Sequence, residues 1–354
     1  MGIKPKNFLF FLGLECYIMR ITYGKQEKVH FCQKKDQLGL AAEPTRAEGW
    51  VMQVILAQPR GFCSGVIRAI RIVEQALENY GNQVYVLHEI VHNRHVVENL
   101  EKQGALFVES LEEVPVGAIT VFSAHGVSSA VITEAKKRNL RTIDATCPLV
   151  TKVHRQAQQF SDQGFDLIII GHPGHPEVEG TRGRIEGPVY VLSSAAEVAT
   201  LKVRHPDRLA YVTQTTFSMD DSLKIIEALK KRFPVQGPDL SNICYATQSR
   251  QNSIRRLANS IDLLLVVGDR KSSNSNRLRE VGEQNGVLSY LIEGPEDLNP
   301  AWFSENTRVG ITAGASAPQE MVERVLERLC TYYPCTVTEM TGETESIPFD
   351  SLKA

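Results

Sequence analysis

The stretch Gly61-Phe62-Cys63-Ser64-Gly65 decides the fold, because two similar stretches recur further along the chain. They are Ala145-Thr146-Cys147-Pro148 and Asn242-Ile243-Cys244-Tyr245. Each cysteine stands where an apolar, strand-like run gives way to a segment with helical spacing of its apolar residues. Counting from the cysteines gives 29 residues to His92, 28 to His175 and 28 to Ser272. This nearly constant spacing predicts three copies of one structural unit.

Each predicted unit holds three polar loops, and each loop follows a predicted strand or turn and precedes a predicted helix. The strands are expected at residues 84–87, 166–170 and 262–267, and again at 119–123, 209–213 and 309–312. Strands that alternate with helices predict parallel sheets, in which ligands bind beyond the carboxyl ends of the strands. The sequence therefore predicts an α/β fold of three pseudo-threefold-related lobes, a trefoil, around one shared centre.

The expected domains follow from this repeat. Lobe 1 is predicted at residues 52–146, lobe 2 at 147–243 and lobe 3 at 244–334, with a C-terminal tail at 335–354. Residues 1–51 contain no convincing signal-peptide cleavage site, and they join no repeat. We expect them to be a poorly structured extension, or the product of a start codon placed too early, with Met52 opening the real domain.

Composition excludes several classes of function. The chain has 354 residues, is 42% hydrophobic and 23% charged, and carries a formal net charge of −2. This charge offers no general attraction to nucleic acid. The longest apolar runs are far too short to span a bilayer, so no membrane partner is expected. We expect a cytoplasmic globular protein with reduced thiols.

The seven cysteines indicate the class of chemistry. Cys330 and Cys335 are interpreted as small buried hydrophobic residues. Cys63, Cys147 and Cys244 are each expected at a helix N-terminus, where the helix dipole favours the thiolate. If the three converge, they could hold zinc in a hydrolase, or an iron-sulfur cluster in an enzyme or in a non-enzymatic redox sensor.

The chain resembles the LytB (IspH) family of 4-hydroxy-3-methylbut-2-enyl diphosphate reductases from Met52 to about Pro334. The motifs that carry this resemblance include the three cysteine stretches and six others. These are Val91-His92-Asn93, Ser123-Ala124-His125-Gly126-Val127, Gly174-His175-Pro176-Glu177-Val178-Glu179-Gly180, Thr213-Gln214-Thr215-Thr216, Ser272-Ser273-Asn274-Ser275-Asn276-Arg277 and Thr312-Ala313-Gly314-Ala315-Ser316-Ala317-Pro318.

The resemblance implies one [4Fe-4S] cluster per chain, held by Cys63, Cys147 and Cys244, with one iron left open for the substrate. It also implies a two-electron reductive loss of an allylic hydroxyl, which yields isopentenyl and dimethylallyl diphosphates in the last step of the non-mevalonate (MEP/DOXP) pathway. The electrons would come from an external ferredoxin or flavodoxin, because the sequence has no flavin or nicotinamide fingerprint. A monomer or weak dimer is expected.

The substrate's diphosphate needs hydrogen-bond donors and positive charge. The expected substrate-binding residues are His92, His125, His175, Thr215, Ser272, Ser273, Asn274 and Ser316. We expect the histidines to bind most strongly when protonated. The remaining histidines are interpreted as structural or exposed, although His172 lies in the same loop as His175.

Glu177 and Thr215 are the expected catalytic residues. Breaking the C–O bond releases hydroxide unless a proton arrives, so a general acid is required. A carboxyl group in a closed cavity should have a raised pKa and could hold that proton. We expect Thr215, taken as the repeat equivalent of Ser272, to orient the substrate hydroxyl or to relay the proton. The alternative role for Glu177 is an acid in the first turn of a surface helix.

Overall fold

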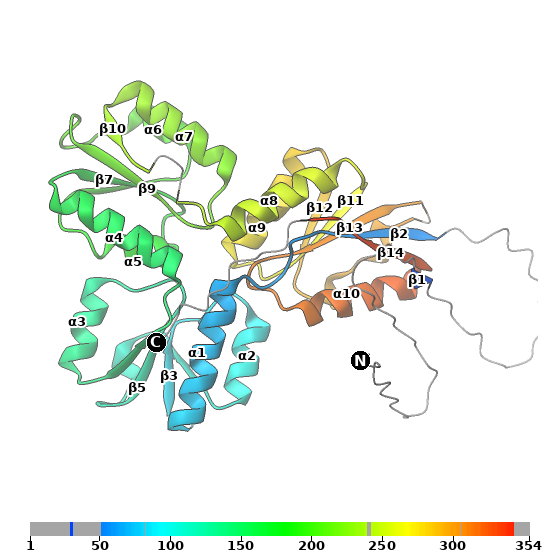
Figure 1. Ribbon diagram of the computed structural model, residues 1–354, viewed down its shortest axis with the longest axis horizontal. Coiled ribbons are helices and arrows are strands. Elements are labelled where there is room, and N and C mark those ends of the chain that lie inside the picture. The colour runs from blue at the N-terminus through cyan, green and yellow to red at the C-terminus, as the bar shows by residue number, and fades with distance from the viewer. Residues whose placement is uncertain (1–28, 31–50, 82, 239–241, 305, 343–354) are drawn as a thin grey trace, which may run out of the picture.

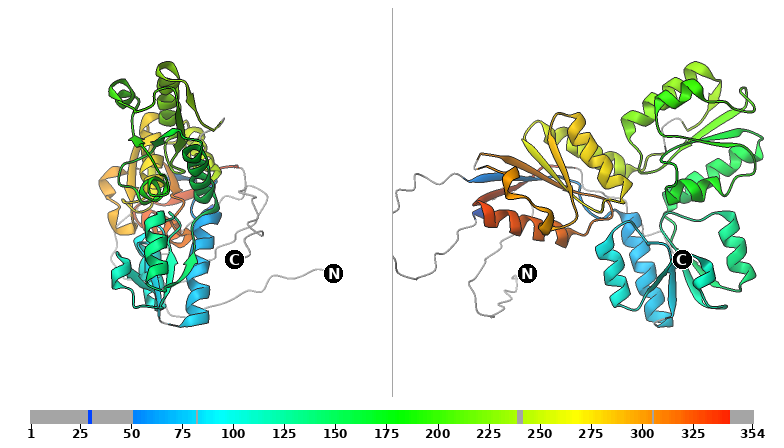
Figure 2. Two further views of the ribbon diagram at one scale, coloured as in Figure 1. Left: turned by 90° about the vertical axis from the view of Figure 1, so that its left-hand side faces the viewer. Right: turned by 180° about the vertical axis from the view of Figure 1, so that it is seen from behind.

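Three α/β lobes make up the computed structural model, as the sequence predicts (Figures 1 and 2). The structure describes residues 29–30, 51–81, 83–238, 242–304 and 306–342. The expected extension at 1–51 lies outside these residues, except for residues 29–30 and 51. No helix within the described ranges is long and apolar enough to cross a membrane.

Lobe 1 is built on a parallel sheet with the strand order β4-β3-β5-β6. Its elements are α1 (Ser64–Tyr80), β3 (Val84–Leu87), α2 (Arg94–Lys102), β4 (Leu106–Val108), η1 (Leu111–Glu113), β5 (Ile119–Phe122), α3 (Ser129–Lys137) and β6 (Arg141–Asp144).

Lobe 2 repeats this design with the parallel order β8-β7-β9-β10. Its elements are α4 (Pro148–Asp162), β7 (Asp166–Ile170), α5 (Pro176–Arg182), β8 (Val189–Leu192), α6 (Ala195–Thr200), β9 (Leu209–Thr213), α7 (Met219–Arg232) and β10 (Val235–Gln236).

Lobe 3 has the strand order β12-β11-β13-β2-β14-β1, in which β1 alone is antiparallel to its neighbour. Its elements are β1 (Val29–His30), β2 (Met52–Leu56), α8 (Tyr245–Ala258), β11 (Leu263–Val267), α9 (Ser273–Gln284), β12 (Leu288–Ile292), η2 (Pro295–Asp297), η3 (Pro300–Trp302), β13 (Arg308–Ala313), α10 (Gln319–Tyr332) and β14 (Cys335–Glu339).

The lobe boundaries differ from the sequence prediction at two places. Strand β2, expected in lobe 1, pairs with β13 and β14 of lobe 3, and in Figure 1 it runs in blue beside the orange strands. Strand β14 also extends this sheet, so residues 335–339 belong to lobe 3 rather than to a separate tail. Strand β2 pairs in parallel with β13 on one side and with β14 on the other, and both partners are distant from it in sequence.

The position of β2 follows from the repeat. In lobes 1 and 2 the fourth strand, β6 or β10, comes just before the next cysteine, and the helix after that cysteine packs on the next lobe. Strand β2 comes just before Cys63 and fills the fourth place in lobe 3. Each cysteine therefore lies where the chain crosses from one lobe to the next, and β2 closes the ring.

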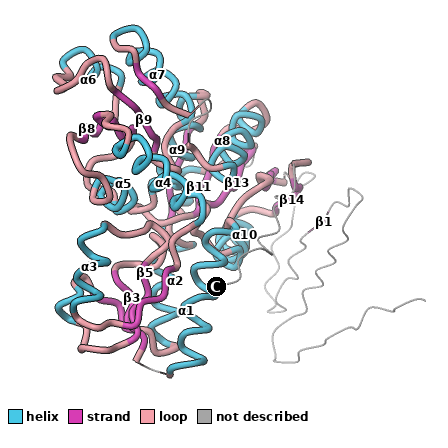
Figure 3. Tube along the Cα trace, turned by 60° about the vertical axis from the view of Figure 1, so that its left-hand side comes forward, coloured by secondary structure: helices cyan, strands magenta, loops and turns pink. Residues whose placement is uncertain are grey.

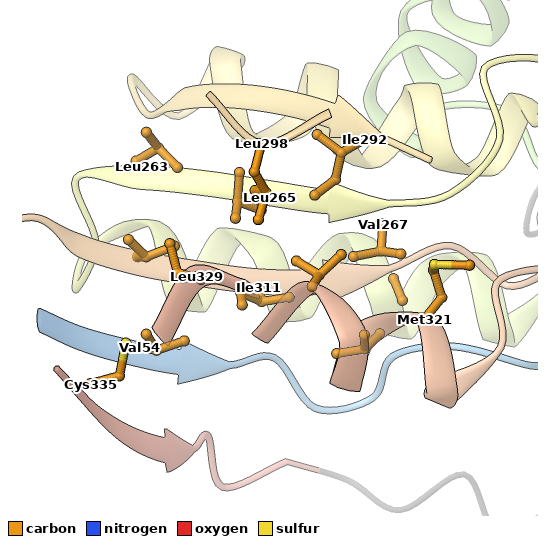
Figure 4. Packing of buried hydrophobic residues seen from close by; sticks show 14 of the residues in the cluster. Val54, Leu263, Leu265, Val267, Ile292, Leu298, Ile311, Met321, Leu329 and Cys335 are labelled. Atoms are coloured by element: carbon orange, nitrogen blue, oxygen red, sulfur yellow. The ribbon is translucent and has the colours of Figure 1, made fainter. Parts of the chain in front are cut away.

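Buried strands hold each lobe together, and helices cover both faces of each sheet (Figure 3). All five residues of β7, β9 and β11 are buried, as expected for parallel strands with helices on both sides. In lobe 3, Leu265, Ile311 and Leu329 pack between the sheet and α10 (Figure 4). These cores fix the strand ends from which the polar loops project.

Candidate active site

The three cysteines occupy equivalent positions. Each is the N-cap of a long helix: Cys63 of α1, Cys147 of α4 and Cys244 of α8. Each backbone N–H donates to a carbonyl oxygen in the third loop of the preceding lobe, at 3.1 Å to Ala315, 3.0 Å to Ala124 and 3.0 Å to Thr215. The same bond therefore fixes each thiol at a lobe junction.

The thiols of Cys63, Cys147 and Cys244 lie near one another, and all three residues are partly buried. Burial is the main cause that raises the pKa of Cys147 to about 12, and the nearby Cys63 and Cys244 add to it, whereas the N–H of Leu149 opposes it. Burial and Cys63 raise the pKa of Cys244 to about 11. For Cys147 and Cys244 the expected preference for thiolate is therefore wrong in the protein without a bound cation, because desolvation outweighs the helix dipole.

The space beside these thiols is kept open by a glycine. A Cβ atom at Gly65 would lie 2.8 Å from Sγ of Cys147 and 3.8 Å from Sγ of Cys63. Within the described ranges, no three His, Cys, Asp or Glu side chains form a group that could hold one metal ion. The thiols of Cys63 and Cys147 border the space that Gly65 leaves open, and thiolates are ligands for soft metals.

Three histidines from two lobes meet in one cluster. The His92 and His125 rings stack with centroids 4.3 Å apart, and the His175 ring lies edge-on at 5.5 Å from His92 and 5.6 Å from His125. His92 precedes the N-cap Asn93 of α2, whereas His175 is itself the N-cap of α5. His92 and His175 each lie five residues past the last residue of β3 or β7, so the extra residue in the spacing of 29 lies between Cys63 and the end of β3.

The charge of this cluster differs from the sequence prediction for two of its members. Burial lowers the pKa of His175 to about 3, and a positive charge on His92 lowers it further. Burial and His92 also hold the pKa of His125 well below its ordinary value. Both rings are therefore neutral without a bound anion. Nδ1 of His175 accepts from the N–H of Glu177 at 3.1 Å, so Nε2 carries its hydrogen.

Glu177 and Thr215 form a buried pair. The backbone N–H of Thr215 donates to Oε1 of Glu177 at 2.6 Å, and its hydroxyl donates to Oε2 at 2.8 Å. Burial raises the pKa of Glu177 to about 7, although both hydrogen bonds oppose the rise. Glu177 is in the first turn of α5 but only 2% exposed, so it is not a surface capping acid. Its charge also raises the pKa of Cys244, which places the carboxyl group near the cysteines.

Lobe 3 contributes hydroxyl and amide groups. Ser272 caps α9, and Ser316 donates to the carbonyl of His92 at 3.0 Å, which joins lobes 1 and 3. Ser273 accepts a hydrogen bond from Gln214 at 3.3 Å. Asn274 is 4% exposed, and both polar atoms of its side chain are buried without a hydrogen-bond partner in the described structure. A buried amide in this state is poised to bind a polar ligand.

One equivalence assumed from the sequence is wrong. Thr215 follows β9, whose counterparts are β5 and β13, so it corresponds to Ala124 and Ala315. Ser272 instead follows β11, the counterpart of β7. Thr215 therefore reaches Glu177 from a different loop of the same lobe.

A cavity of about 500 Å³ opens onto the histidine cluster. The side chains that line it include His92, His172, His175, Lys271, Ser273 and Arg277. Its lining also includes the acid Glu280, and the cations Lys271 and Arg277 suit an anionic ligand. The cavity lies between the loops that follow β3, β7 and β11.

A model of the family described as LytB protein matches residues 54–330. The chain belongs to the LytB family. The 4-hydroxy-3-methylbut-2-enyl diphosphate reductase of Shewanella oneidensis is 54% identical over 302 residues, which span 84% of this chain and 95% of that protein. The enzyme of the same name from Burkholderia pseudomallei is 56% identical over 299 residues, spanning 84% of this chain and 96% of that protein.

Solved structures of LytB relatives share the fold. The E-1-hydroxy-2-methyl-but-2-enyl-4-diphosphate reductase of Plasmodium falciparum has a TM-score of 0.78 at 36% identity, covering 83% of this chain and 93% of that one. A second solved structure is described as (E)-4-hydroxy-3-methyl-but-2-enyl diphosphate reductase, the terminal enzyme of the non-mevalonate pathway. It has a TM-score of 0.58 at 32% identity and covers 79% of this chain and 100% of that one.

The sequence analysis missed several residues of this LytB protein that support the site. Gln214 is 1% exposed and accepts from the N–H of His172 at 2.9 Å, while Arg250 is fully buried and donates to the carbonyl of Gly61 at 2.6 Å. Oε2 of Glu89 lies 3.0 Å from Nδ1 of His92. Glu89 and Gln214 lie within motif loops, which was the available signal, whereas Arg250 follows its cysteine by six residues on α8.

Other histidines take structural positions. His154 is buried in α4 with its pKa lowered to about 4, mainly by burial. His205 bonds to Asp166 at 2.9 Å at the opposite end of the lobe 2 sheet. His172 lines the cavity and lies 3.2 Å from the guanidinium of Arg277.

Proposed function

We propose that this protein is an iron-sulfur oxidoreductase that removes the hydroxyl group of (E)-4-hydroxy-3-methylbut-2-enyl diphosphate to give isopentenyl and dimethylallyl diphosphates. The balanced change is that the allylic alcohol takes up two electrons and two protons and releases water. The relatives that carry this activity in their names support the reaction. The observation that carries the proposal is the buried Glu177–Thr215 pair beside Cys244, whose Glu177 N–H also donates to His175 of the histidine cluster.

We infer that Cys63, Cys147 and Cys244 hold one [4Fe-4S] cluster with one iron left free of protein ligands. The open space at Gly65 and the mutual influence of the thiols support this assignment. A cation in that space would favour the thiolates and lower their pKa values again. When bound, the cluster would pass electrons from the external donor to the substrate one at a time, and it would offer a Lewis-acidic iron.

The diphosphate group fits the polar junction between the lobes. The Nε2–H of His175, the hydroxyls of Ser272, Ser273 and Ser316 and the amide of Asn274 offer donors there. The N-terminus of α9 at Ser272 adds a favourable dipole for an anion. His92 and His125 complete the donor set, and the cavity of about 500 Å³ provides access.

Glu177 would store the proton that leaves with the hydroxyl. With a pKa of about 7 it is half protonated near neutral pH, as a general acid should be. When Glu177 is protonated at Oε2, the Thr215 hydroxyl can accept from it and turn its own hydrogen toward the substrate. Thr215 would then relay the proton between a buried acid and the reacting hydroxyl group.

The electrons would come from a ferredoxin or flavodoxin, and the protein would work in the cytoplasm as a monomer or weak dimer. Five free cysteines among the described residues are consistent with a reducing compartment.

Iron content and turnover test the proposal together. Protein purified without oxygen should be brown, contain iron and acid-labile sulfide, and form both five-carbon diphosphates with a chemical reductant. Cys147→Ser should lose the cluster, and Glu177→Gln should keep the cluster but lose most turnover. A colourless protein that contains zinc would support a hydrolase instead. A cluster whose absorption spectrum does not change when the substrate is added would indicate a redox sensor.

A further inference from the structure

A chain of charged groups joins lobes 1 and 3 at the edge of the histidine cluster. Nζ of Lys271 lies 2.7 Å from Oε1 of Glu89, and Oε2 of Glu89 lies 3.0 Å from Nδ1 of His92. The His92 and Glu89 side chains are 16% and 25% exposed, whereas Lys271 is 70% exposed. The inner pair is thus shielded from water and the outer cation faces the cavity.

Glu89 keeps its negative charge in this position. Burial alone would raise the pKa of Glu89, but the hydrogen bonds from Lys271 and His92 outweigh burial and hold the pKa below its ordinary value. A carboxylate can only accept, so Nδ1 of His92 must carry the hydrogen. Nε2 is then the ring nitrogen that remains for a ligand.

His92 differs from its two neighbours in this respect. Nδ1 of His175 bonds to a backbone N–H, and Nδ1 of His125 lies 3.5 Å from the hydroxyl of Ser123. Among the described residues, neither neighbour has a carboxylate within hydrogen-bonding distance, and both are neutral without a ligand. The bond to Glu89 is charge-assisted when His92 is an imidazolium, and a carboxylate at Nδ1 thus distinguishes His92 from the other two rings.

Lys271 balances the charge of Glu89. An unpaired carboxylate beside the cavity would repel a bound anion, and Lys271 itself lines that cavity. Lys271 directly precedes Ser272, the N-cap of α9, so the bridge also ties the lobe 3 donor loop to lobe 1. Asp269 supports the same contact by accepting from the N–H of Arg94 at 3.0 Å and from the N–H of Lys271 at 2.7 Å.

We propose that Glu89 is a positioning residue for substrate binding, which orients His92 so that Nε2–H faces the diphosphate, and that Lys271 is its counter-charge across the lobe boundary. This inference rests on the proposed role of His92 in diphosphate binding. Glu89 would thus raise the affinity of the histidine cluster for an anion without contacting the substrate itself.

Cluster-loaded Glu89→Gln protein tests the positioning role. Glutamine keeps the shape but not the charge, so the Kd for inorganic diphosphate, measured by calorimetry, and the KM for substrate should both rise about tenfold, as for a lost charge-assisted bond. The kcat and iron content should stay near wild type, because the bond serves ground state and transition state alike. A merely structural residue would instead lower iron content and kcat.

Glu109→Gln is the matched control. Oε2 of Glu109 lies 3.0 Å from Nδ1 of His88, the same contact at an exposed site on the same lobe. We expect wild-type Kd and KM from this variant. Equal behaviour of the Glu89 and Glu109 variants would overturn the proposal.

A double-mutant cycle tests the counter-charge. Lys271→Met should weaken diphosphate binding about tenfold in the wild-type background but by less than about threefold beside Glu89→Gln, because the neutral amide needs no counter-charge. Equal losses in both backgrounds would contradict this role and make Lys271 a direct ligand.

His92→Asn separates this inference from the substrate site on which it rests. If His92→Asn binds inorganic diphosphate as well as wild type, the assignment of the diphosphate site fails. If His92→Asn loses affinity while Glu89→Gln does not, the positioning role of Glu89 alone fails.

Discussion

Replacing Thr215 with valine should shift the pH dependence of turnover upward, because Thr215 holds both oxygen atoms of the Glu177 carboxylate. Its N–H lies 2.6 Å from Oε1 and its hydroxyl 2.8 Å from Oε2. Burial raises the pKa of Glu177 to about 7, and these two bonds oppose the rise. Valine keeps the shape and the N–H but removes the hydroxyl.

The size of the effect follows from the hydrogen bond that is lost. A hydrogen bond to a charged group contributes about 1.5–3 kcal/mol, and about 1.4 kcal/mol corresponds to one pH unit. The pKa of Glu177 should therefore rise by about one to two pH units. A general acid works only when protonated, so turnover falls as pH rises through this pKa. In Thr215→Val the fall should occur about one to two pH units higher, with maximal turnover reduced roughly 100-fold as the relay is lost.

The assay is kcat against pH with a chemical reductant under anaerobic conditions, with iron content measured for each sample. Thr181→Val is the control, because the buried Thr181 hydroxyl donates to the backbone carbonyl of Glu177 at 2.8 Å and not to its carboxylate. The control should keep the wild-type profile. If the turnover of Thr215→Val falls at the same pH as that of the wild type, or at a lower pH, the Thr215 hydroxyl does not hold down the pKa of Glu177.

Three further predictions follow from the structure. Glu177→Gln should stabilise the protein at alkaline pH. Glu177 binds its proton more tightly in the folded protein than in the unfolded chain, so the wild type loses folding free energy as pH rises from about 4.5 to about 7, and glutamine does not ionise. Its advantage over wild type in urea unfolding should grow by about 2–3 kcal/mol between about pH 5 and about pH 8, and a constant difference would contradict the raised pKa. Gly65→Ala should lose most bound iron, since its Cβ would lie 2.8 Å from Sγ of Cys147, and unchanged iron would contradict the assigned space. Leu265→Ala, in the core of lobe 3, should lower the free energy of unfolding by about 2–5 kcal/mol in urea titrations, and a loss under about 1 kcal/mol would contradict close packing there.

Local signals were sufficient for the elements and for the convergence of the site. Capping preferences and strand-to-helix turns are properties of short segments, so the repeat of Cys63, Cys147 and Cys244 predicted three equivalent helix N-termini. Parallel sheets then require the loops after the strands to share one edge. This is why His92 and His175, distant in sequence, lie in one cluster.

Long-range pairing and charge could not be predicted in the same way. The pairing of β2 with β13 joins segments at opposite ends of the chain, and the apolar sequence of a strand does not specify which strand it pairs with. The protonation of His125 and His175 depends on burial and on neighbouring rings, which are known only once the lobes are assembled. The equivalence of Thr215 with Ser272 failed because two loops of each unit have similar polar composition.

The difference between the constant and the variable positions of the repeat separates the roles of the residues. All three lobes place a cysteine at the crossover, held by the same backbone bond, which suits a ligand set for one group on the pseudo-threefold axis. The other loops differ: lobe 1 provides His92 and His125, lobe 2 provides His175 with Glu177 and Thr215, and lobe 3 provides hydroxyls and the unpartnered amide of Asn274. A diphosphate at one end of a substrate and a reacting hydroxyl at the other cannot be bound by three identical loops. In the proposed function, the threefold symmetry would therefore be kept where the cofactor binds and broken where the asymmetric substrate binds.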